Sequence, residues 1–165
     1  MLFKLGGYTV GFFLLIISTA AMAAPKVGDK FGAWSFKCQA TAANKTSCAL
    51  SQTLVNKKTK RRVLRVVLSK QNKSNNHQLL VLAPLGIYIP SGVVATVDKG
   101  SSISLALATC SQQGCMARGA VSRQLLQKIK AGNNLNIKFS FNPKAKPVTL
   151  QASLKGISAG IKALN

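Results

Sequence analysis

The chain has 165 residues, and its 23 Lys and Arg residues against two Asp and Glu residues give a formal net charge of +21. Two carboxylates and a single His leave few side chains for general acid–base chemistry near neutral pH, and the sequence has no Gly-x-Ser-x-Gly motif. The composition therefore argues against an enzyme and favours polyanions as partners; the alternative is a generally solvated basic surface.

Residues 1–23 are predicted to be a secretory signal peptide. Lys4 provides the positive charge, residues 10–18 provide a short apolar segment, and Ala21-Met22-Ala23 forms a small-x-small cleavage site. The apolar segment is shorter than the ~20 residues that a spanning helix needs, and a retained anchor is the alternative. We expect an exported chain with no transmembrane span after cleavage, whose four cysteines are oxidised.

The rest of the chain is predicted to form one domain. Residues 24–30 are interpreted as a flexible leader, and residues 31–165 as a single domain long enough to bury a core. Residues 31–39 alternate between apolar and polar side chains, which is typical of a half-buried strand. The inward pattern resumes at Cys48 in the next strand. A disulfide between Cys38 and Cys48 would therefore close a hairpin between two inward positions.

The densest run of basic residues follows at a predicted turn, before a strand with Leu64, Val66 and Leu68 inward. Flexible Lys and Arg side chains on a turn can reach phosphate or sulfate groups, so this turn is a candidate anion-binding site. The alternative is that the charges keep a strand edge from pairing with a neighbour. The candidate residues are Lys57, Lys58, Lys60, Arg61, Arg62 and Arg65.

Short strands separated by turn signals continue along the chain, which predicts a sandwich or barrel. Residues 102–122 read as a hairpin in which Gly114 closes the turn with a positive φ. Cys110 and Cys115 then lie across from each other at a separation that a disulfide can span. Other pairings of the four cysteines stay open at this point, because four cysteines allow three connectivities.

One clear helix and one short closing helix are predicted in the last third of the chain. Ser122 caps the start of the first helix and Gly132 ends it. A strand follows, with alternating side chains that place Phe139 and Phe141 inward. Residues 157–164 are expected to form the closing helix, which brings the total to about nine strands with one or two helices.

The few side chains suited to catalysis or metal binding do not form a recognisable motif. Asp98 lies in a Val-Asp-Lys-Gly turn, where an aspartate caps its own backbone, and His77 follows a polar loop. The cysteine spacings do not match the paired ligands of zinc sites, and a Cys-x-x-Cys motif is absent. We therefore predict no catalytic residues, no metal and no cofactor, and structural disulfides.

The order and spacing of several motifs carry a family resemblance. They are residues 31–38 (Phe-Gly-Ala-Trp-Ser-Phe-Lys-Cys), Cys48 with Gln52, residues 84–93 leading to 98–100, Cys110 and Cys115 with Gly114, the helix ending at Gly132, and residues 154–157. With these motifs the chain resembles the invasion-associated locus B family, exported proteins of alphaproteobacteria, over nearly its whole mature length.

The resemblance implies an all-β fold, an immunoglobulin-like antiparallel β-sandwich with two local disulfides, Cys38 to Cys48 and Cys110 to Cys115. It also implies a periplasmic or envelope location and, for pathogenic members, a contribution to the invasion of host erythrocytes. It supplies no catalytic or ligand-binding residues. The near absence of acidic residues is a departure from many members of the family that the chain resembles.

These observations lead to one functional hypothesis and one alternative. The chain is expected to be an exported, non-enzymatic envelope protein that contributes to host-cell invasion by docking its basic surface on anionic material. Candidate partners are lipopolysaccharide, acidic lipid, glycans or a host-cell receptor. The alternative is a periplasmic envelope-maintenance or general polyanion-binding module without a direct host role. Nucleic acid is disfavoured, because no aromatic residues are interleaved with the basic run. The expected location is the periplasm or outer envelope, with the cell surface left open.

Overall fold

The computed structural model describes residues 24–42, 45–71 and 76–164, so the predicted signal peptide lies outside the described residues. The strands are β1 (Lys30–Phe31), β2 (Trp34–Ala42), β3 (Lys45–Val55), β4 (Arg62–Lys70), β5 (His77–Ala83), β6 (Val93–Val97), β7 (Ser102–Ser111), β8 (Gly114–Val121), β9 (Asn134–Phe139) and β10 (Val148–Ser153). The helices are α1 (Arg123–Ala131), α2 (Ile157–Ala163) and the short 3₁₀ helix η1 (Ile89–Ser91).

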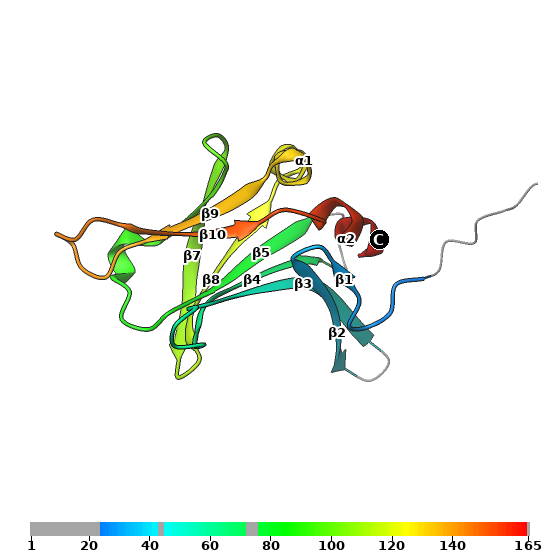
Figure 1. Ribbon diagram of the computed structural model, residues 1–165, viewed down its shortest axis with the longest axis horizontal. Helices are drawn as coiled ribbons and strands as arrows, with labels where there is room; N and C mark the ends of the chain where they lie inside the picture. Colours follow the sequence, from blue (N-terminus) through cyan, green and yellow to red (C-terminus); the bar gives the residue numbers. More distant parts are fainter. Residues whose placement is uncertain (1–23, 43–44, 72–75, 165) are drawn as a thin grey trace, which may run out of the picture.

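All strand pairs are antiparallel, and the strand order is β1-β2-β3-β4-β5-β8-β7-β6-β9-β10. The sheet curls so that its two halves face each other across the core (Figure 1). β7 joins the halves, because its first residues pair with β6 and its later residues pair with β8. The all-β antiparallel fold is therefore confirmed. The described residues form ten strands in one continuous sheet, including the two-residue β1, where the sequence predicts about nine.

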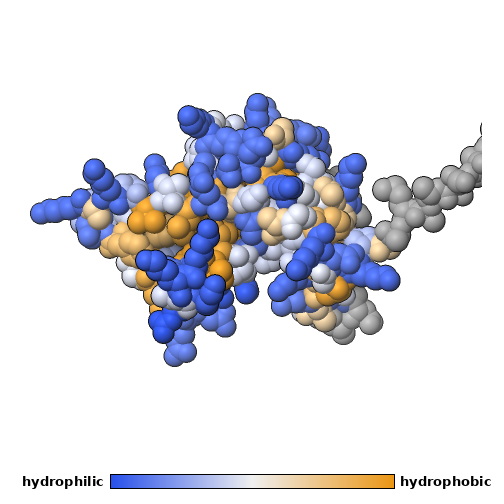
Figure 2. Space-filling view, in the orientation of Figure 1, coloured by the Kyte–Doolittle hydropathy of each residue, from blue (hydrophilic) through white to orange (hydrophobic). Residues whose placement is uncertain are grey.

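The core lies between the facing halves of the sheet, and side-chain alternation decides which residues enter it. Leu64, Val66 and Leu68 of β4 are buried as predicted. Trp34 is 1% exposed, and its indole N–H donates to the carbonyl oxygen of Ser153 at 2.8 Å. Hydrophilic side chains cover much of the outer surface (Figure 2). The expected division into an inward apolar face and an outward polar face is thus present.

The amide of Gln52 provides a second polar link within the core. Its Nε2 donates to the carbonyl oxygen of Ser153 at 2.9 Å, and its Oε1 accepts from the Ser153 backbone N–H at 2.9 Å. Gln52 is buried on β3, whereas Ser153 is the last residue of β10. Because a buried amide must be hydrogen-bonded, these contacts fix where β10 ends against β3.

The predicted helix at residues 122–132 is confirmed as α1. The Ser122 hydroxyl accepts from the Leu125 backbone N–H at 3.2 Å, which is the expected cap. Gly132 follows the helix with φ −81°, so a left-handed conformation is not the reason for glycine there. A Cβ at this position would lie 2.6 Å from the Cγ1 of Val97. Glycine is therefore needed for close packing against β6.

The prediction that Phe141 points inward is wrong. β9 ends at Phe139, and the carbonyl oxygen of the following Ser140 accepts from the Tyr88 backbone N–H at 2.7 Å. This bond ends the alternation, and Phe141 is 46% exposed. Its ring packs edge-to-face on Phe139 with centroids 5.6 Å apart.

The predicted flexible leader is partly paired with β2. The backbone N–H of Gly28 donates to the carbonyl oxygen of Phe36 at 2.8 Å, and the backbone N–H of Phe36 donates to the carbonyl oxygen of Asp29 at 2.8 Å. Lys30 belongs to β1. These bonds hold residues 28–30 against the sheet. The division of the whole chain into signal peptide, leader and one domain stays a prediction.

Antiparallel pairing separates the connections into two groups. The turns that follow β3, β5, β7 and β9 gather at one end of the sheet, which we call the turn end: residues 56–61, 84–92, 112–113 and 140–147. The connections that follow β6 and β8 gather at the opposite end, which we call the helix end: residues 98–101 and 122–133, including α1. Figure 1 shows the first group at the left and bottom and α1 at the top.

Candidate functional site

The basic turn between β3 and β4 is ordered by Asn56. The Asn56 Oδ1 accepts from the backbone N–H groups of Lys58 at 2.9 Å and Thr59 at 3.1 Å, which is an Asx-type turn. The Asn56 backbone N–H donates to the carbonyl oxygen of Arg61 at 2.9 Å, and the Asn56 carbonyl oxygen accepts from the Lys60 backbone N–H at 2.9 Å. The Lys and Arg side chains therefore extend from a defined backbone into solvent.

The structure divides the six candidate cations into two sets. The Arg62 guanidinium donates to the carbonyl oxygen of Gln113 on the β7–β8 turn, and the Arg65 Nε donates to Thr53 Oγ1 at 3.3 Å. These two residues are engaged in holding neighbouring strands and turns. The other four are exposed and have no side-chain partner in the described part of the chain: Lys57, Lys58, Lys60 and Arg61. The anion-binding role itself stays a prediction.

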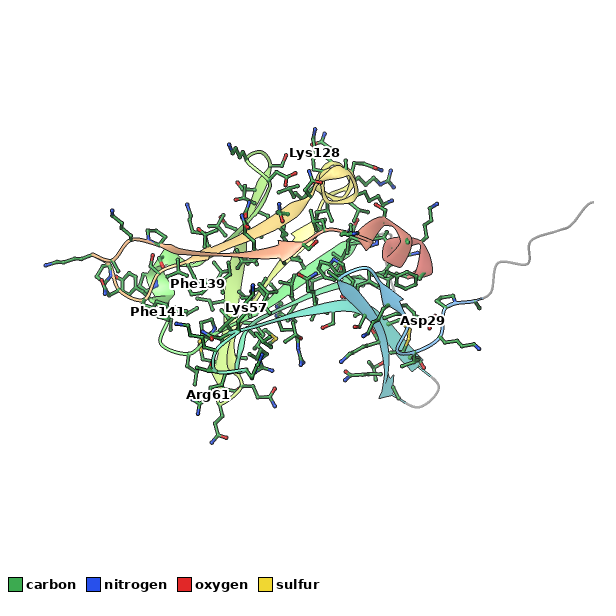
Figure 3. The ribbon with its side chains drawn as sticks, in the orientation of Figure 1. Asp29, Lys57, Arg61, Lys128, Phe139 and Phe141 are labelled. Carbon is green, nitrogen blue, oxygen red and sulfur yellow. A yellow bond between two sulfur atoms is a disulfide. The ribbon has the colours of Figure 1, made fainter. Side chains whose placement is uncertain are left out.

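Large apolar side chains are exposed at the same end of the sheet, and sequence reasoning missed this grouping. The exposed fractions are 51% for Val55, 53% for Leu85, 59% for Ile89 and 46% for Phe141. Each residue ends a strand or lies in a turn of the turn end. Figure 2 shows an apolar area on the left half of the molecule with hydrophilic side chains around it, and Figure 3 places Phe141 on that side.

Hydrogen bonds connect the turns that carry these residues. Arg62 reaches the β7–β8 turn, and Tyr88 beside η1 bonds to Ser140 beside Phe141. Gly114 has φ +125°, as its turn requires, and a Cβ there would collide with the carbonyl oxygen of Ala83 at the end of β5. The four turns are therefore neighbours, although they come from positions between residues 56 and 147.

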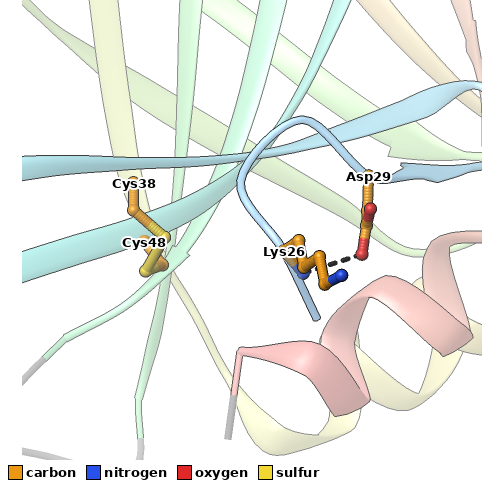
Figure 4. Close-up of a disulfide and its surroundings, with 4 residues drawn as sticks. All are labelled: Lys26, Asp29, Cys38 and Cys48. Carbon is orange, nitrogen blue, oxygen red and sulfur yellow. Dashed lines mark hydrogen bonds between the residues drawn. A yellow bond between two sulfur atoms is a disulfide. The ribbon is translucent and has the colours of Figure 1, made fainter. Parts of the chain in front are cut away.

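Both carboxylates of the chain lie away from the turn end. The Asp98 carboxylate accepts from the backbone N–H groups of Asn133 at 3.1 Å and Asn134 at 2.9 Å. The prediction that Asp98 caps its own turn is therefore wrong, because it caps the connection between α1 and β9. Asp29 accepts from the Lys26 backbone N–H at 2.7 Å in the leader (Figure 4).

His77 is a buried residue of β5, where the sequence predicts only that it follows a polar loop. Burial lowers the pKa of its imidazole, and the positive charges of Lys70 and Lys130 lower it further. Its Nε2 has no hydrogen-bond partner in the described part of the chain. Among the described residues no group of three metal-ligating side chains occurs.

Two disulfides fasten hairpins, and they pair the cysteines as the family resemblance implies. Cys38 and Cys48 face each other across β2 and β3 with a Cα–Cα distance of 4.0 Å (Figure 4). Cys110 and Cys115 face each other across β7 and β8, also at 4.0 Å. The second bridge fixes the hairpin whose turn receives the Arg62 hydrogen bond.

The described residues contain no helix whose length and apolar character would let it cross a bilayer. The fold and the candidate site together define a strongly basic, disulfide-bonded, all-β protein with cationic turns at one end of its sheet.

Comparisons with known proteins place this architecture in a family. The model of the family described as Invasion associated locus B (IalB) protein matches residues 34–165, and the chain belongs to this family. The Invasion protein B homologs of two Brucella abortus strains, 2308 and biovar 1 strain 9-941, are each 26% identical over 155 residues, covering 90% of this chain and 88% of theirs.

A solved structure shares the fold. The crystal structure of the invasion associated protein B from Bartonella henselae superposes with a TM-score of 0.74 and 23% sequence identity, covering 82% of this chain and 92% of that chain. The family resemblance stated from the sequence motifs is thereby confirmed.

Proposed function

We propose that the mature chain is an exported, non-enzymatic protein of the cell envelope that docks on anionic cell-surface material and thereby contributes to host-cell invasion. The family and the names of its Brucella and Bartonella relatives support the association with invasion. The net charge of +21 for the full sequence, of which only Lys4 lies in the predicted signal peptide, supports a polyanionic partner.

The exposure of four cations on one ordered turn supports the proposal that docking uses the basic turn. Lys57, Lys58, Lys60 and Arg61 are exposed on one ordered turn, and their side chains have no carboxylate neighbour on the turn-end connections. Four unpaired cations within five residues produce a local positive potential that phosphate or sulfate groups can neutralise. The neighbouring bonds of Arg62 and Arg65 hold that turn against the sheet.

Salt-dependent retention tests the docking. The mature protein is passed over immobilised heparin and over phosphatidylglycerol vesicles, with K57Q/K58Q/K60Q/R61Q and the control R123Q/K128Q/K155Q/K162Q. Both variants lose four exposed charges, but the control loses them from α1, the β10–α2 connection and α2. About 1 kcal/mol per cation near an anionic surface predicts that the turn variant binds vesicles at least about a hundredfold more weakly. Equal weakening by both variants, or no salt-sensitive retention of the native protein, would contradict the proposal.

Protease accessibility tests the location and separates the proposal from its alternative. Digestion of the protein on intact cells is expected if it is displayed at the surface. Protection until the outer membrane is opened would instead favour the periplasmic envelope-maintenance module, whose polyanionic partners lie inside the envelope. The blot follows the mature chain, so that the predicted removal of residues 1–23 is checked in the same experiment.

A further inference from the structure

The turn end combines two chemical features that a simple polyanion site does not need together. Its four exposed apolar side chains account for all but one of the large apolar residues exposed in the described part of the chain; the exception is Val27 of the leader. Six cations are exposed on its turns, Lys57, Lys58, Lys60, Arg61, Lys144 and Lys146, and the exposed Arg62 begins β4 beside them. The chain has no carboxylate in these turns, since its two acidic residues are Asp29 and Asp98.

The apolar side chains are presented by ordered backbone. η1 is closed by the Ser91 hydroxyl, which donates to the Tyr88 carbonyl oxygen at 2.8 Å. Asn142 Oδ1 accepts from the backbone N–H groups of Lys144 at 3.0 Å and Ala145 at 2.7 Å, and so shapes the loop after Phe141. Little conformational entropy is therefore lost when this surface binds, because its turns are already formed.

An anionic lipid bilayer offers both complementary features. Its phosphate groups lie at the surface, and its acyl chains begin directly beneath them, so cations bind above while apolar side chains enter below. A sulfated glycan satisfies the cations but leaves the apolar side chains in water.

We propose that the turn end is an interfacial membrane-docking surface. Val55, Leu85, Ile89 and Phe141 enter the acyl boundary of an anionic bilayer, while the surrounding Lys and Arg side chains bind lipid phosphates. This inference rests on the proposed function and names acidic lipid as the partner among the anionic materials considered.

Vesicle partitioning separates insertion from pure charge attraction. The mature protein, L85S/I89S/F141S and the control V27S are each mixed with vesicles of phosphatidylcholine alone and of phosphatidylcholine with phosphatidylglycerol. The native protein and V27S are expected to bind the anionic vesicles. A fraction of each protein is expected to stay bound at high salt, because apolar insertion is not screened. Loss of three apolar side chains that the bilayer would bury predicts partitioning at least about tenfold weaker for the triple variant, with heparin retention unchanged.

A fluorescent reporter keeps the inference testable if the triple variant folds poorly. Trp34 is the single Trp and is buried, so a Trp at position 141 reports on the turn end. Acyl-brominated anionic lipids are expected to quench the emission of F141W and to leave that of V27W unchanged.

The outcomes separate bilayer insertion from docking by charge alone. If the emission of F141W is not quenched, insertion is overturned and docking by charge remains. The same conclusion follows if the folded triple variant partitions as strongly as the native protein and high salt abolishes that binding entirely. Failure of the native protein to be retained on heparin and on anionic vesicles alike would overturn the proposed function and the inference with it.

Discussion

The helix end and the turn end of the sheet differ in how far their apolar side chains are buried. At the helix end, α1 covers the sheet and buries Leu125, Leu126 and Ile129, and Asp98 caps the backbone that leads into β9. At the turn end no α-helix covers the connections, and the apolar side chains of Leu85, Ile89 and Phe141 remain exposed.

Charge alone does not distinguish the ends, because Arg123 and Lys128 also expose cations on α1. In Figure 3, Lys128 lies at the top, well separated from Lys57, Arg61 and Phe141. What differs is the combination of exposed apolar surface, cations and no carboxylate. The helix end therefore buries its apolar side chains against the sheet, whereas the turn end exposes them beside cations, as the proposed docking surface requires.

The largest expected effect comes from a matched pair of isoleucines. Ile129→Ala removes a side chain that is 2% exposed on α1, so the free energy of unfolding should fall by about 2–5 kcal/mol. Ile89→Ala at the turn end should change it by less than about 0.5 kcal/mol, because the side chain is already in water. Urea unfolding followed by circular dichroism measures both, and equal losses would contradict the difference in burial between the two ends.

The disulfides are expected to give the next largest effect. Loop-closure entropy predicts a loss of about 2.7 kcal/mol for C38S/C48S, with a sequence separation of 10, and about 2.1 kcal/mol for C110S/C115S, with a separation of 5. Denaturant midpoints of the oxidised protein and the two double variants test the order. A larger loss of unfolding free energy for C110S/C115S would show that this disulfide stabilises the turn-end hairpin by more than the loop-closure entropy accounts for.

Asp98 is expected to contribute more than Asp29, the other acidic residue of the chain. Asp98→Ala leaves the backbone N–H groups of Asn133 and Asn134 without their charged acceptor, and hydrogen bonds to charged groups predict a loss of about 1.5 kcal/mol or more. Asp29→Ala removes one bond in the exposed leader and should cost less. Thermal unfolding of both variants checks this, and a similar melting temperature for the two would contradict the assigned cap.

The smallest expected effect is a pH dependence at the helix end. The pKa of His77 is lower in the folded chain than its ordinary value of 6.5, so the unfolded chain binds a proton at higher pH than the folded chain does. Stability from this group is therefore complete above about pH 6.5 and decreases as the pH falls below it. His77→Leu should flatten the dependence below about pH 6.5. An unchanged slope in the variant would exclude His77 as its source.

Local patterns predicted much of the fold. The alternation of β4 and the Ser122 cap of α1 depend on neighbouring residues, and both are present as predicted. The two hairpin disulfides join cysteines that are close in sequence. Periodicity and capping are visible in a short window, which is why these elements could be predicted.

The errors and omissions involve contacts between distant residues. Asp98 caps a backbone 35 residues away, and Gln52 bonds to Ser153 across 101 residues. Phe141 faces solvent because Tyr88 bonds to Ser140 and β9 ends there. The basic run was visible in the sequence, but the apolar half of the turn end required the strand order, which brings four separate turns together.

Hydrogen–deuterium exchange of the mature protein, with and without phosphatidylglycerol vesicles, tests most directly whether the turn end is the docking surface. We expect slower exchange at residues 56–61, 84–92 and 140–147 when vesicles are present, and unchanged exchange in α1. Slower exchange in α1 with unchanged turns would contradict this expectation, because the helix end would then contact the bilayer.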